Sequence, residues 1–297
     1  MKFGLFGGAS AQRGGVASDS TQGYRDFIDY VAEAEELGYH SVFLVEHHFT
    51  GFGQVSASLN LLTFLAARTR RIRLGTAVVV LPWHNPVLLA EEAATVDLLS
   101  NGRLDFGVGK GYRPNEFHGF NVDQHDAQER FDEALDVIRR AWTSEEPFSH
   151  RGRHWSYENI VVEPPCIQKP YPPLWIAAGR PDTIANAAES GFNLLLDQIA
   201  PFDVIGERLA VYRDRTVALG RKFDAQRVAV ARALHITRTE AEREEAHVLR
   251  GRLLGGISRL SRVRGGGGHE STMLQYNDTR LATEEGALIG PPEEIIE

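Results

Sequence analysis

Short apolar runs alternate with segments of helical periodicity along this chain of 297 residues, and this alternation is the feature that most restricts its fold. Strands that are separated by helices pair in parallel, because each helix returns the chain to the same end of the sheet. The predicted strands are residues 2–6, 41–45, 72–80, 104–108, 174–177, 192–196 and 228–236. The predicted helices are residues 22–37, 56–67, 87–99, 127–142, 182–190, 204–219 and one that begins at residue 240.

Seven strand–helix units favour a barrel of parallel strands, the TIM (β/α)8 type, over two smaller domains. After the seventh unit the sequence is rich in glycine, and the segment from Gly290 to Glu297 is typical of a helix that begins. We identify no residues for an eighth strand and its helix. Residues 1–297 are therefore expected to form one barrel domain that is either truncated or left open.

Two segments depart from the alternation. Residues 146–173 are rich in Pro, Tyr, Trp and His, which predicts an excursion with a small hairpin. Residues 251–278 form a polar segment with glycines, which predicts a mobile lid. A loop without function is the alternative for this second segment.

Composition limits the classes of partner. The net charge of -8 argues against nucleic acid and against anionic membranes, since either would require a basic face. The single cysteine, Cys166, excludes an intrachain disulfide and a cysteine-cluster metal site. No apolar run reaches the length of a membrane span, and we expect a soluble, cytoplasmic protein.

The sequence Glu46-His47-His48 directly follows the predicted strand 41–45. Barrels of this type place their chemistry at the C-terminal ends of the strands. An imidazole can donate or accept a proton near neutral pH. A metal site is not predicted at these residues, because adjacent residues on an extended segment point apart and a helical His-x-x-x-His pair is absent.

Three motifs together resemble the bacterial luciferase-like flavin-dependent monooxygenases, in particular the luciferase alpha subunit and its single-chain relatives. They are residues 46–50, 74–82 and 102–111, with a weaker match at residues 177–183. The resemblance implies a TIM barrel and reduced FMN (FMNH2) as cofactor. It also implies activation of O2 as a peroxyflavin, oxygenation of a small organic substrate and a separate flavin reductase.

The resemblance also implies roles for particular residues. His47 is the expected catalytic residue, with His48 in support. A non-proline cis peptide between Ala77 and Val78 would support the flavin ring, although an ordinary core strand is the alternative there. The expected phosphate-binding residues are Lys110, Gly179, Arg180 and Thr183.

A strand-to-helix connection such as residues 177–183 offers free N–H groups and the positive end of a helix dipole, which suits a phosphate. The alternative for Asp182 and Thr183 is a plain helix cap. Lys110 keeps the positive charge of the arginine that is usual in the family, but it lacks the bidentate fork.

Other residues at predicted strand ends are candidates for a flavin or substrate pocket, and each could equally be a satisfied loop residue. The main candidates are Glu46, His48, Trp83, Tyr112, Asp197 and Gln198, followed by His84, Arg113, Asn115 and Glu116. Several aromatic residues nearby predict a largely apolar substrate. These are Phe49, Phe52, Trp83, Tyr112 and Phe117.

Three alternatives remain open at this stage. The first is a deazaflavin-dependent oxidoreductase on the same barrel, which would transfer hydride without oxygen. The second is a flavin-binding protein without catalysis. The third is one subunit of a hetero-oligomer whose partner completes the site; a homodimer is the other expected assembly. Light emission is not favoured, because nothing in the sequence selects a long-chain aldehyde.

Overall fold

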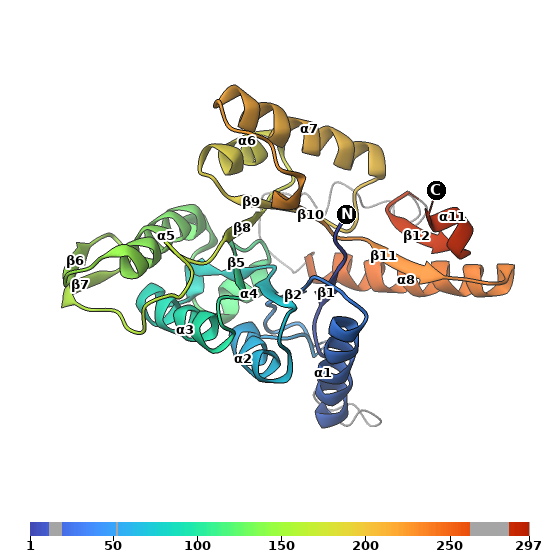
Figure 1. Ribbon diagram of the computed structural model, residues 1–297, viewed down its shortest axis with the longest axis horizontal. Helices are drawn as coiled ribbons and strands as arrows, with labels where there is room; N and C mark the ends of the chain where they lie inside the picture. Colours follow the sequence, from blue (N-terminus) through green and yellow to red (C-terminus); the bar gives the residue numbers. More distant parts are fainter. Residues whose placement is uncertain (12–19, 52, 262–284, 297) are drawn as a thin grey trace. The chain divides into compact units, whose positions relative to one another are not determined.

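The computed structural model describes residues 1–11, 20–51, 53–261 and 285–296 (Figure 1). The chain divides into two compact units, Met1–Ile176 and Ala177–Glu297.

The first unit is built on a parallel sheet. Its strands pair in the order β1 (Gly4–Gly7), β2 (Ser41–Leu44), β3 (Arg73–Thr76), β5 (Leu104–Gly109) and β8 (Leu174–Ala177), and the short β4 (Val79–Val80) pairs with β5. All six residues of β5 are buried. Burial on both faces explains why these strands read as continuous apolar runs rather than as alternating ones.

The helices of the first unit follow its strands. They are α1 (Ser20–Glu36), α2 (Ser58–Arg68), α3 (Pro86–Leu99) and α5 (Ala127–Thr143), with α2 packed on α3 and α3 on α5. Figure 1 shows α2, α3 and α5 in blue to green. Helix α3 begins where the Asn85 side chain accepts the N–H groups of Val87 and Leu88, and Pro86 occupies the first helical position.

Three short helices lie in the connections that follow the strands of this unit. They are η1 (Leu81–Trp83) after β4, α4 (Pro114–Gly119) after β5, and η2 (Gln124–Asp126) before α5. An antiparallel hairpin of β6 (Phe148–Arg151) and β7 (Ser156–Ile160) lies within residues 146–173.

The second unit contains a parallel pair, β9 (Asn193–Leu196) and β10 (Val228–Val230), with α6 (Pro181–Glu189) packed on α7 (Phe202–Ala218). Its buried cluster includes Ile184, Leu194, Leu196, Ile205 and Tyr212. The remaining elements are η3 (Ala225–Arg227), β11 (Ala233–Ile236), α8 (Glu240–Ser261), β12 (Ala287–Gly290) and α11 (Pro292–Ile296).

The prediction that no residues remain for an eighth strand is wrong. Strand β12 pairs in parallel with β11, from Ala233 opposite Ala287 to Ile236 opposite Gly290. Ala287 and Ile289 are buried against Ala246 of α8. A run of four residues beside Gly286 and Pro291 carries almost no strand signal of its own, because its stability comes from the partner strand. The predicted strand 228–236 is also divided, into β10 and β11.

The segment predicted as a lid is only partly described. Residues 251–261 continue helix α8, and residues 262–278 lie outside the described residues. The lid therefore stays a prediction.

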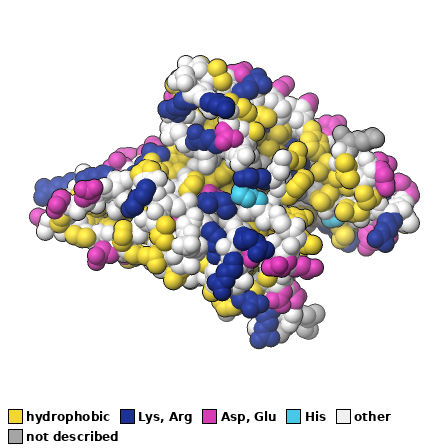
Figure 2. All heavy atoms as spheres, in the orientation of Figure 1, with side chains coloured by type: hydrophobic (Ala, Val, Ile, Leu, Met, Phe, Trp, Pro, Cys, Tyr) yellow, Lys and Arg dark blue, Asp and Glu magenta, His cyan; other side chains and the backbone are white. Residues whose placement is uncertain are grey.

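Other expectations from composition can be compared with the structure. Cys166 is a free, buried thiol, and burial raises its pKa to about 12, which makes it a poor nucleophile. Among the described helices, none is both long and apolar enough to cross a membrane. The face that Figure 2 shows carries both basic and acidic side chains.

Candidate active site

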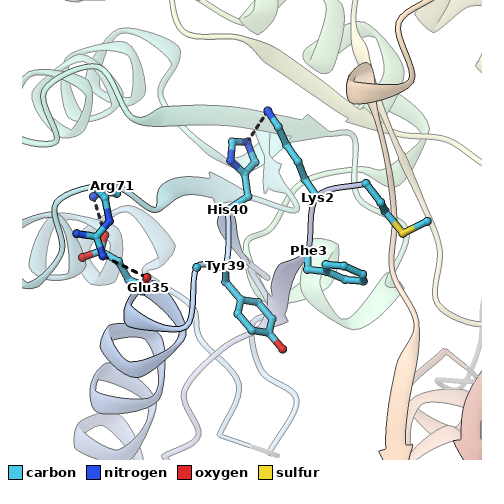
Figure 3. A pocket seen from close by; sticks show the side chains of 8 residues that line it. Lys2, Phe3, Glu35, Tyr39, His40 and Arg71 are labelled. Atoms are coloured by element: carbon cyan, nitrogen blue, oxygen red, sulfur yellow. Dashed lines mark hydrogen bonds between the residues drawn. The ribbon is translucent and has the colours of Figure 1, made fainter. Parts of the chain in front are cut away.

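A cavity of about 360 Å³ lies at the N-terminal ends of strands β1, β2 and β3 (Figure 3). The polar groups around it are engaged in structure: the Glu35 carboxylate accepts the backbone N–H groups of residues 70–72, which precede β3. This end of a parallel barrel usually serves stability rather than chemistry. The cavity is lined by Met1, Lys2, Phe3, Glu35, Gly38, Tyr39, His40 and Arg71.

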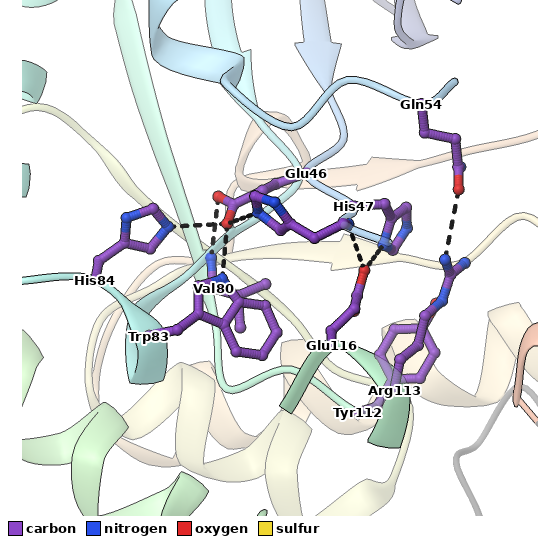
Figure 4. Close-up of polar contacts among 10 residues, drawn as sticks. Glu46, His47, Gln54, Val80, Trp83, His84, Tyr112, Arg113 and Glu116 are labelled. Atoms are coloured by element: carbon purple, nitrogen blue, oxygen red, sulfur yellow. Dashed lines mark hydrogen bonds and ion pairs between the residues drawn. The ribbon is translucent and has the colours of Figure 1, made fainter. Parts of the chain in front are cut away.

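The opposite ends of these strands carry a cluster of polar side chains centred on Glu46 (Figure 4). Glu46 follows β2 and is 3% exposed. Its Oε1 atom accepts hydrogen bonds from His48 Nε2 at 3.0 Å, Trp83 Nε1 at 3.0 Å and His84 Nε2 at 2.8 Å. One buried carboxylate therefore holds two histidines and an indole in fixed orientations.

Glu46 remains ionised despite its burial. Burial by itself raises the pKa of a carboxyl group, but the hydrogen bonds from His48, His84 and Trp83 lower the pKa of Glu46 from 4.5 to about 2. The carboxylate is charged throughout the neutral range and acts as an acceptor only.

A second carboxylate, Glu116 on α4, orients His47 (Figure 4). Its Oε1 atom lies 3.1 Å from His47 Nδ1 and accepts the backbone N–H of His48 at 2.8 Å. Within the described residues, the other ring nitrogen of His47, Nε2, has no hydrogen-bond partner. A neutral imidazole that donates from Nδ1 carries its lone pair on Nε2, so that atom can accept a proton from a bound molecule.

The surroundings of His47 favour its neutral form. Burial lowers the pKa of His47, the hydrogen bond with Glu116 raises it, and the nearby charge of Arg113 lowers it again, with a net shift downward from 6.5. The side chain keeps 16% of its surface exposed. His47 therefore combines a neutral ring with limited access to solvent.

Arg113 is a buried cation with neutral partners. It is 2% exposed, its Nε donates to the Tyr112 hydroxyl at 3.2 Å, and its Nη1 donates to Gln54 Oε1 at 3.4 Å. In the described part of the chain, no carboxylate lies within ion-pair distance of this guanidinium. Because a buried charge is costly without a counter-charge, this position favours the binding of an anionic group.

Aromatic rings form a wall beside the histidines. Trp83 stacks on Phe120 with ring centroids 5.3 Å apart, and its edge meets Phe117 at 5.0 Å. Phe49 lies 5.0 Å from Phe120. Of the apolar residues predicted for the pocket, Phe52 lies outside the described residues.

The peptide bond between Ala77 and Val78 is cis, as the sequence analysis expected. The Ala77 N–H donates to the Leu44 carbonyl at 2.7 Å, which places this bond beside the end of β2. A Cβ atom at Gly109 would lie 2.5 Å from the Val78 side chain, so the glycine in β5 is needed for this packing. The role of Ala77 and Val78 as a flavin support stays a prediction.

Lys110 follows β5, and its Nζ donates to Gln128 Oε1 on α5 at 3.2 Å. The first unit thus brings together Glu46, His47, His48, Trp83 and Tyr112, while Lys110 has its own contact outside this network. Its predicted role toward phosphate is neither supported nor contradicted by that contact.

The predicted phosphate residues of the second unit surround the start of α6. The Arg180 guanidinium pairs with Asp182 at 2.7 Å, and the Thr183 hydroxyl donates to the Arg180 carbonyl at 2.9 Å. Gly179 directly precedes this turn. Both side chains are engaged locally, but the Arg180 side chain at the N-cap makes no capping hydrogen bond, and the phosphate role stays a prediction.

Asp197 and Gln198 follow β9 in the second unit. The Asp197 carboxylate accepts the N–H groups of Ile199 and Ala200, both at 2.8 Å, and pairs with Arg208. The Gln198 carbonyl accepts Arg250 Nη2 at 2.7 Å. Both residues therefore stabilise the turn that follows β9. Their role in ligand binding stays a prediction.

Sequence reasoning identified Glu116 and His84 only as general pocket candidates and missed Gln54 and Phe120. Glu116 lies 69 positions from His47, and no local pattern connects the two. Phe120 follows Gly119 at the end of α4, a short helix that the sequence analysis did not predict.

Comparisons with known proteins agree with these motifs. The family model described as luciferase-like monooxygenase matches residues 1–297. The oxygenase component of the flavin-dependent trigonelline monooxygenase of Acinetobacter baylyi is 30% identical over 84% of this chain and 68% of its own length. The matches to four curated relatives, of which this is one, cover between 30% and 68% of each relative's own length.

Solved structures share the fold. The monooxygenase RslO1 of Streptomyces bottropensis has a TM-score of 0.81 and 29% identity, over 99% of this chain and 86% of that one. The oxygenating constituent of 3,6-diketocamphane monooxygenase of Pseudomonas putida, solved with FMN, has a TM-score of 0.77 and 18% identity, over 99% of this chain and 86% of that one. The predicted fold class is confirmed.

Proposed function

Because the chain belongs to the luciferase-like monooxygenase family, we propose that it is the oxygenase component of a two-component flavin-dependent monooxygenase. A separate reductase would supply FMNH2, and the substrate would be a small, largely apolar organic molecule. The observation that carries this proposal is the His47–Glu116 pair. Glu116 engages Nδ1 of His47 and leaves its Nε2 atom available to a bound molecule, at a strand end beside the aromatic wall.

The residues around His47 suit a flavin. The half-buried Ala77 and Val78 and the ring of Trp83, which packs on the buried Phe117, offer apolar contact to an aromatic ring system. The buried guanidinium of Arg113 would meet a negative charge without a competing carboxylate. The proposed phosphate ligands are Lys110 in the first unit and Gly179, Arg180 and Thr183 in the second.

Reduced FMN, when bound, supplies the electrons that activate O2. The chain supplies the proton chemistry: Glu116 fixes the tautomer of His47, and Nε2 of the neutral ring accepts or shares a proton. Glu46 holds His48, Trp83 and His84 in place. The aromatic wall would limit the access of water to the reacting atoms.

The substitution His47→Ala tests this proposal, with His118→Ala as a matched control at an exposed histidine of α4. We expect His47→Ala to lower turnover by about 100-fold or more, since a positioned acid or base contributes about 10²–10⁴-fold. The assay would screen small apolar substrates with chemically reduced FMN and O2 and measure product. Unchanged turnover in His47→Ala would remove His47 from the mechanism.

The cofactor is tested separately by anaerobic titration of the protein with FMNH2 and with a reduced deazaflavin, followed by fluorescence. We expect saturable binding of FMNH2. Binding of the deazaflavin alone, with turnover that needs no O2, would instead establish the hydride-transfer alternative. Binding of FMNH2 without turnover of any substrate would favour a flavin-binding protein.

A further inference from the structure

A second cluster of ionisable side chains lies outside the proposed active site, where the β6–β7 hairpin meets the start of α5 (Figure 1). Asp126 ends η2, Glu129 lies in the first turn of α5, and His154 lies in the turn between β6 and β7. One ligand atom from each of these residues lies within 4.8 Å of the other two. Carboxylate oxygens and imidazole nitrogens are common ligands of transition metals.

The backbone at His154 is held firmly. The Glu133 carboxylate accepts the N–H of His154 at 3.0 Å and the N–H of Trp155 at 2.9 Å, and it also contacts His150 Nε2 at 3.1 Å. Glu129 and Glu133 are four residues apart and therefore lie on the same face of α5. The turn is thus fixed in a position that directs His154 toward Glu129.

The imidazole of His154 has an unsatisfied nitrogen. Its side chain is 6% exposed, and in the described part of the chain its buried Nε2 atom has no hydrogen-bond partner. Glu129 Oε2 lies 3.8 Å away, which is too far for a hydrogen bond. Buried polar atoms are nearly always paired, so this nitrogen is a vacant donor or ligand position directed at two carboxylates.

An exposed cation, the Arg153 guanidinium, occupies the other side of the cluster. Arg153 Nη1 lies 2.5 Å from Glu129 Oε2, and Nη2 lies 3.4 Å from Asp126 Oδ1. The Arg153 side chain is 63% exposed and can turn into solvent without leaving a cavity. The two carboxylates therefore attract positive charge, and the charge that they hold can be exchanged.

We propose that Asp126, Glu129 and His154 bind a divalent transition metal ion, best Zn²⁺, in exchange for the Arg153 side chain. Zn²⁺ accepts mixed nitrogen and oxygen ligands at about 2.0–2.2 Å, so two ligands of a tetrahedral site lie roughly 3.4 Å apart. The 3.8 Å between His154 Nε2 and Glu129 Oε2 is close to this spacing. Ca²⁺ and Mg²⁺ prefer sites made of oxygen alone. The bound ion would join the hairpin to α5.

Calorimetric titration of the metal-free chain of 297 residues with Zn²⁺ tests the site. We expect one equivalent to bind with a measurable Kd, and we expect His154→Asn and Glu129→Gln each to weaken binding at least 10-fold. Arg153→Ala should tighten binding several-fold, because it removes the competing cation. His125→Asn is the matched control, because His125 is an exposed histidine beside Asp126 and should bind no differently from the wild type.

Two further readouts keep the test decisive. Co²⁺ in place of Zn²⁺ should give the visible absorption of a tetrahedral site in the wild type and not in His154→Asn. If His154→Asn fails to fold, the exposed position Glu129→Gln provides the same comparison. The proposal is overturned if the wild type binds no stoichiometric Zn²⁺, if His154→Asn and Glu129→Gln bind as well as the wild type, or if His125→Asn loses binding equally.

Discussion

At the scale of residues, two buried carboxylates determine the state of the histidines after β2. Glu46 holds His48 and His84 through one oxygen atom, and Glu116 holds His47. The hydrogen-bond donors around Glu46 lower its pKa against the effect of burial, whereas burial dominates at His47 and lowers the pKa of the imidazole. The rings of the adjacent histidines are therefore held by different carboxylates, although the backbone N–H of His48 also donates to Glu116.

Glu116→Gln should lower the pKa of His47 further, because it removes the carboxylate that raises it, and should reduce turnover by about 10- to 100-fold. Arg113→Met should shift the pKa of His47 in the opposite direction, since the Arg113 charge lowers it. Titration of the histidine ring by NMR, together with turnover against pH, checks both expectations. Shifts of the same sign in the two variants would contradict this account of the site.

Glu46→Ala should lower the free energy of unfolding by about 1–3 kcal/mol at neutral pH, because it leaves partly buried donors of His48, Trp83 and His84 without an acceptor. Urea unfolding measures the difference, with the exposed Glu145→Ala as the control. A loss no larger than that of the control would show that the network contributes nothing to stability.

The same carboxylate makes stability depend on pH. Its folded pKa of about 2 lies below the ordinary 4.5, so the unfolded chain binds more protons and the stabilisation is lost as pH falls from 4.5 toward 2. The difference in unfolding free energy between wild type and Glu46→Ala should therefore shrink in this range. A difference that stayed constant down to pH 2 would contradict the lowered pKa.

At the scale of elements, the site is formed by connections that follow neighbouring parallel strands. The turn after β2, the short helix η1 after β4 and the helix α4 after β5 each contribute one part of it. Parallel strands end at the same edge of a sheet, so these connections meet there although they are far apart in sequence. The β6–β7 hairpin is attached differently, through the Glu133 carboxylate on α5.

Glu133→Ala should loosen that hairpin, because it frees the backbone N–H groups of His154 and Trp155. Hydrogen exchange should become about 10-fold faster over residues 148–160 while the parallel strands keep their protection. Asp132→Ala, at an exposed position of the same helix where the carboxylate accepts from Gln128 rather than from the hairpin, is the control and should exchange like the wild type. Unchanged exchange in Glu133→Ala would mean that other contacts hold the hairpin.

At the scale of the whole molecule, the family assignment and the proposed activity rest on different observations. The family model matches the full length of the chain, and the solved relatives share its fold. The activity rests on the cluster around His47 in the first unit. The cavity at the N-terminal ends of β1, β2 and β3 is distinct from that cluster.

Because a separate reductase is proposed to supply the FMNH2, we predict that the chain alone does not use a nicotinamide cofactor. With NADH and oxidised FMN it should consume no O2, whereas chemically reduced FMN or an added flavin reductase should restore turnover. Oxygen uptake and product formation measure this. NADH-dependent turnover by the purified chain alone would contradict the two-component proposal.

The sequence by itself determined the alternation of strands and helices and the position of Glu46-His47-His48 after β2, whereas the cis peptide between Ala77 and Val78 was expected only from the family resemblance. These features follow from local patterns: apolar runs, helix ends and continuous motifs. The sequence failed at β12, where four residues become a strand only through pairing with β11.

Only the tertiary structure decided which carboxylate forms a hydrogen bond with which histidine. Glu116 reaches His47 across 69 positions, and His84 reaches Glu46 across 38. Such pairs depend on the register of parallel strands and on where short helices begin after them. Local sequence preferences fix where an element forms, but side chains from different elements meet only after the sheet has set their positions.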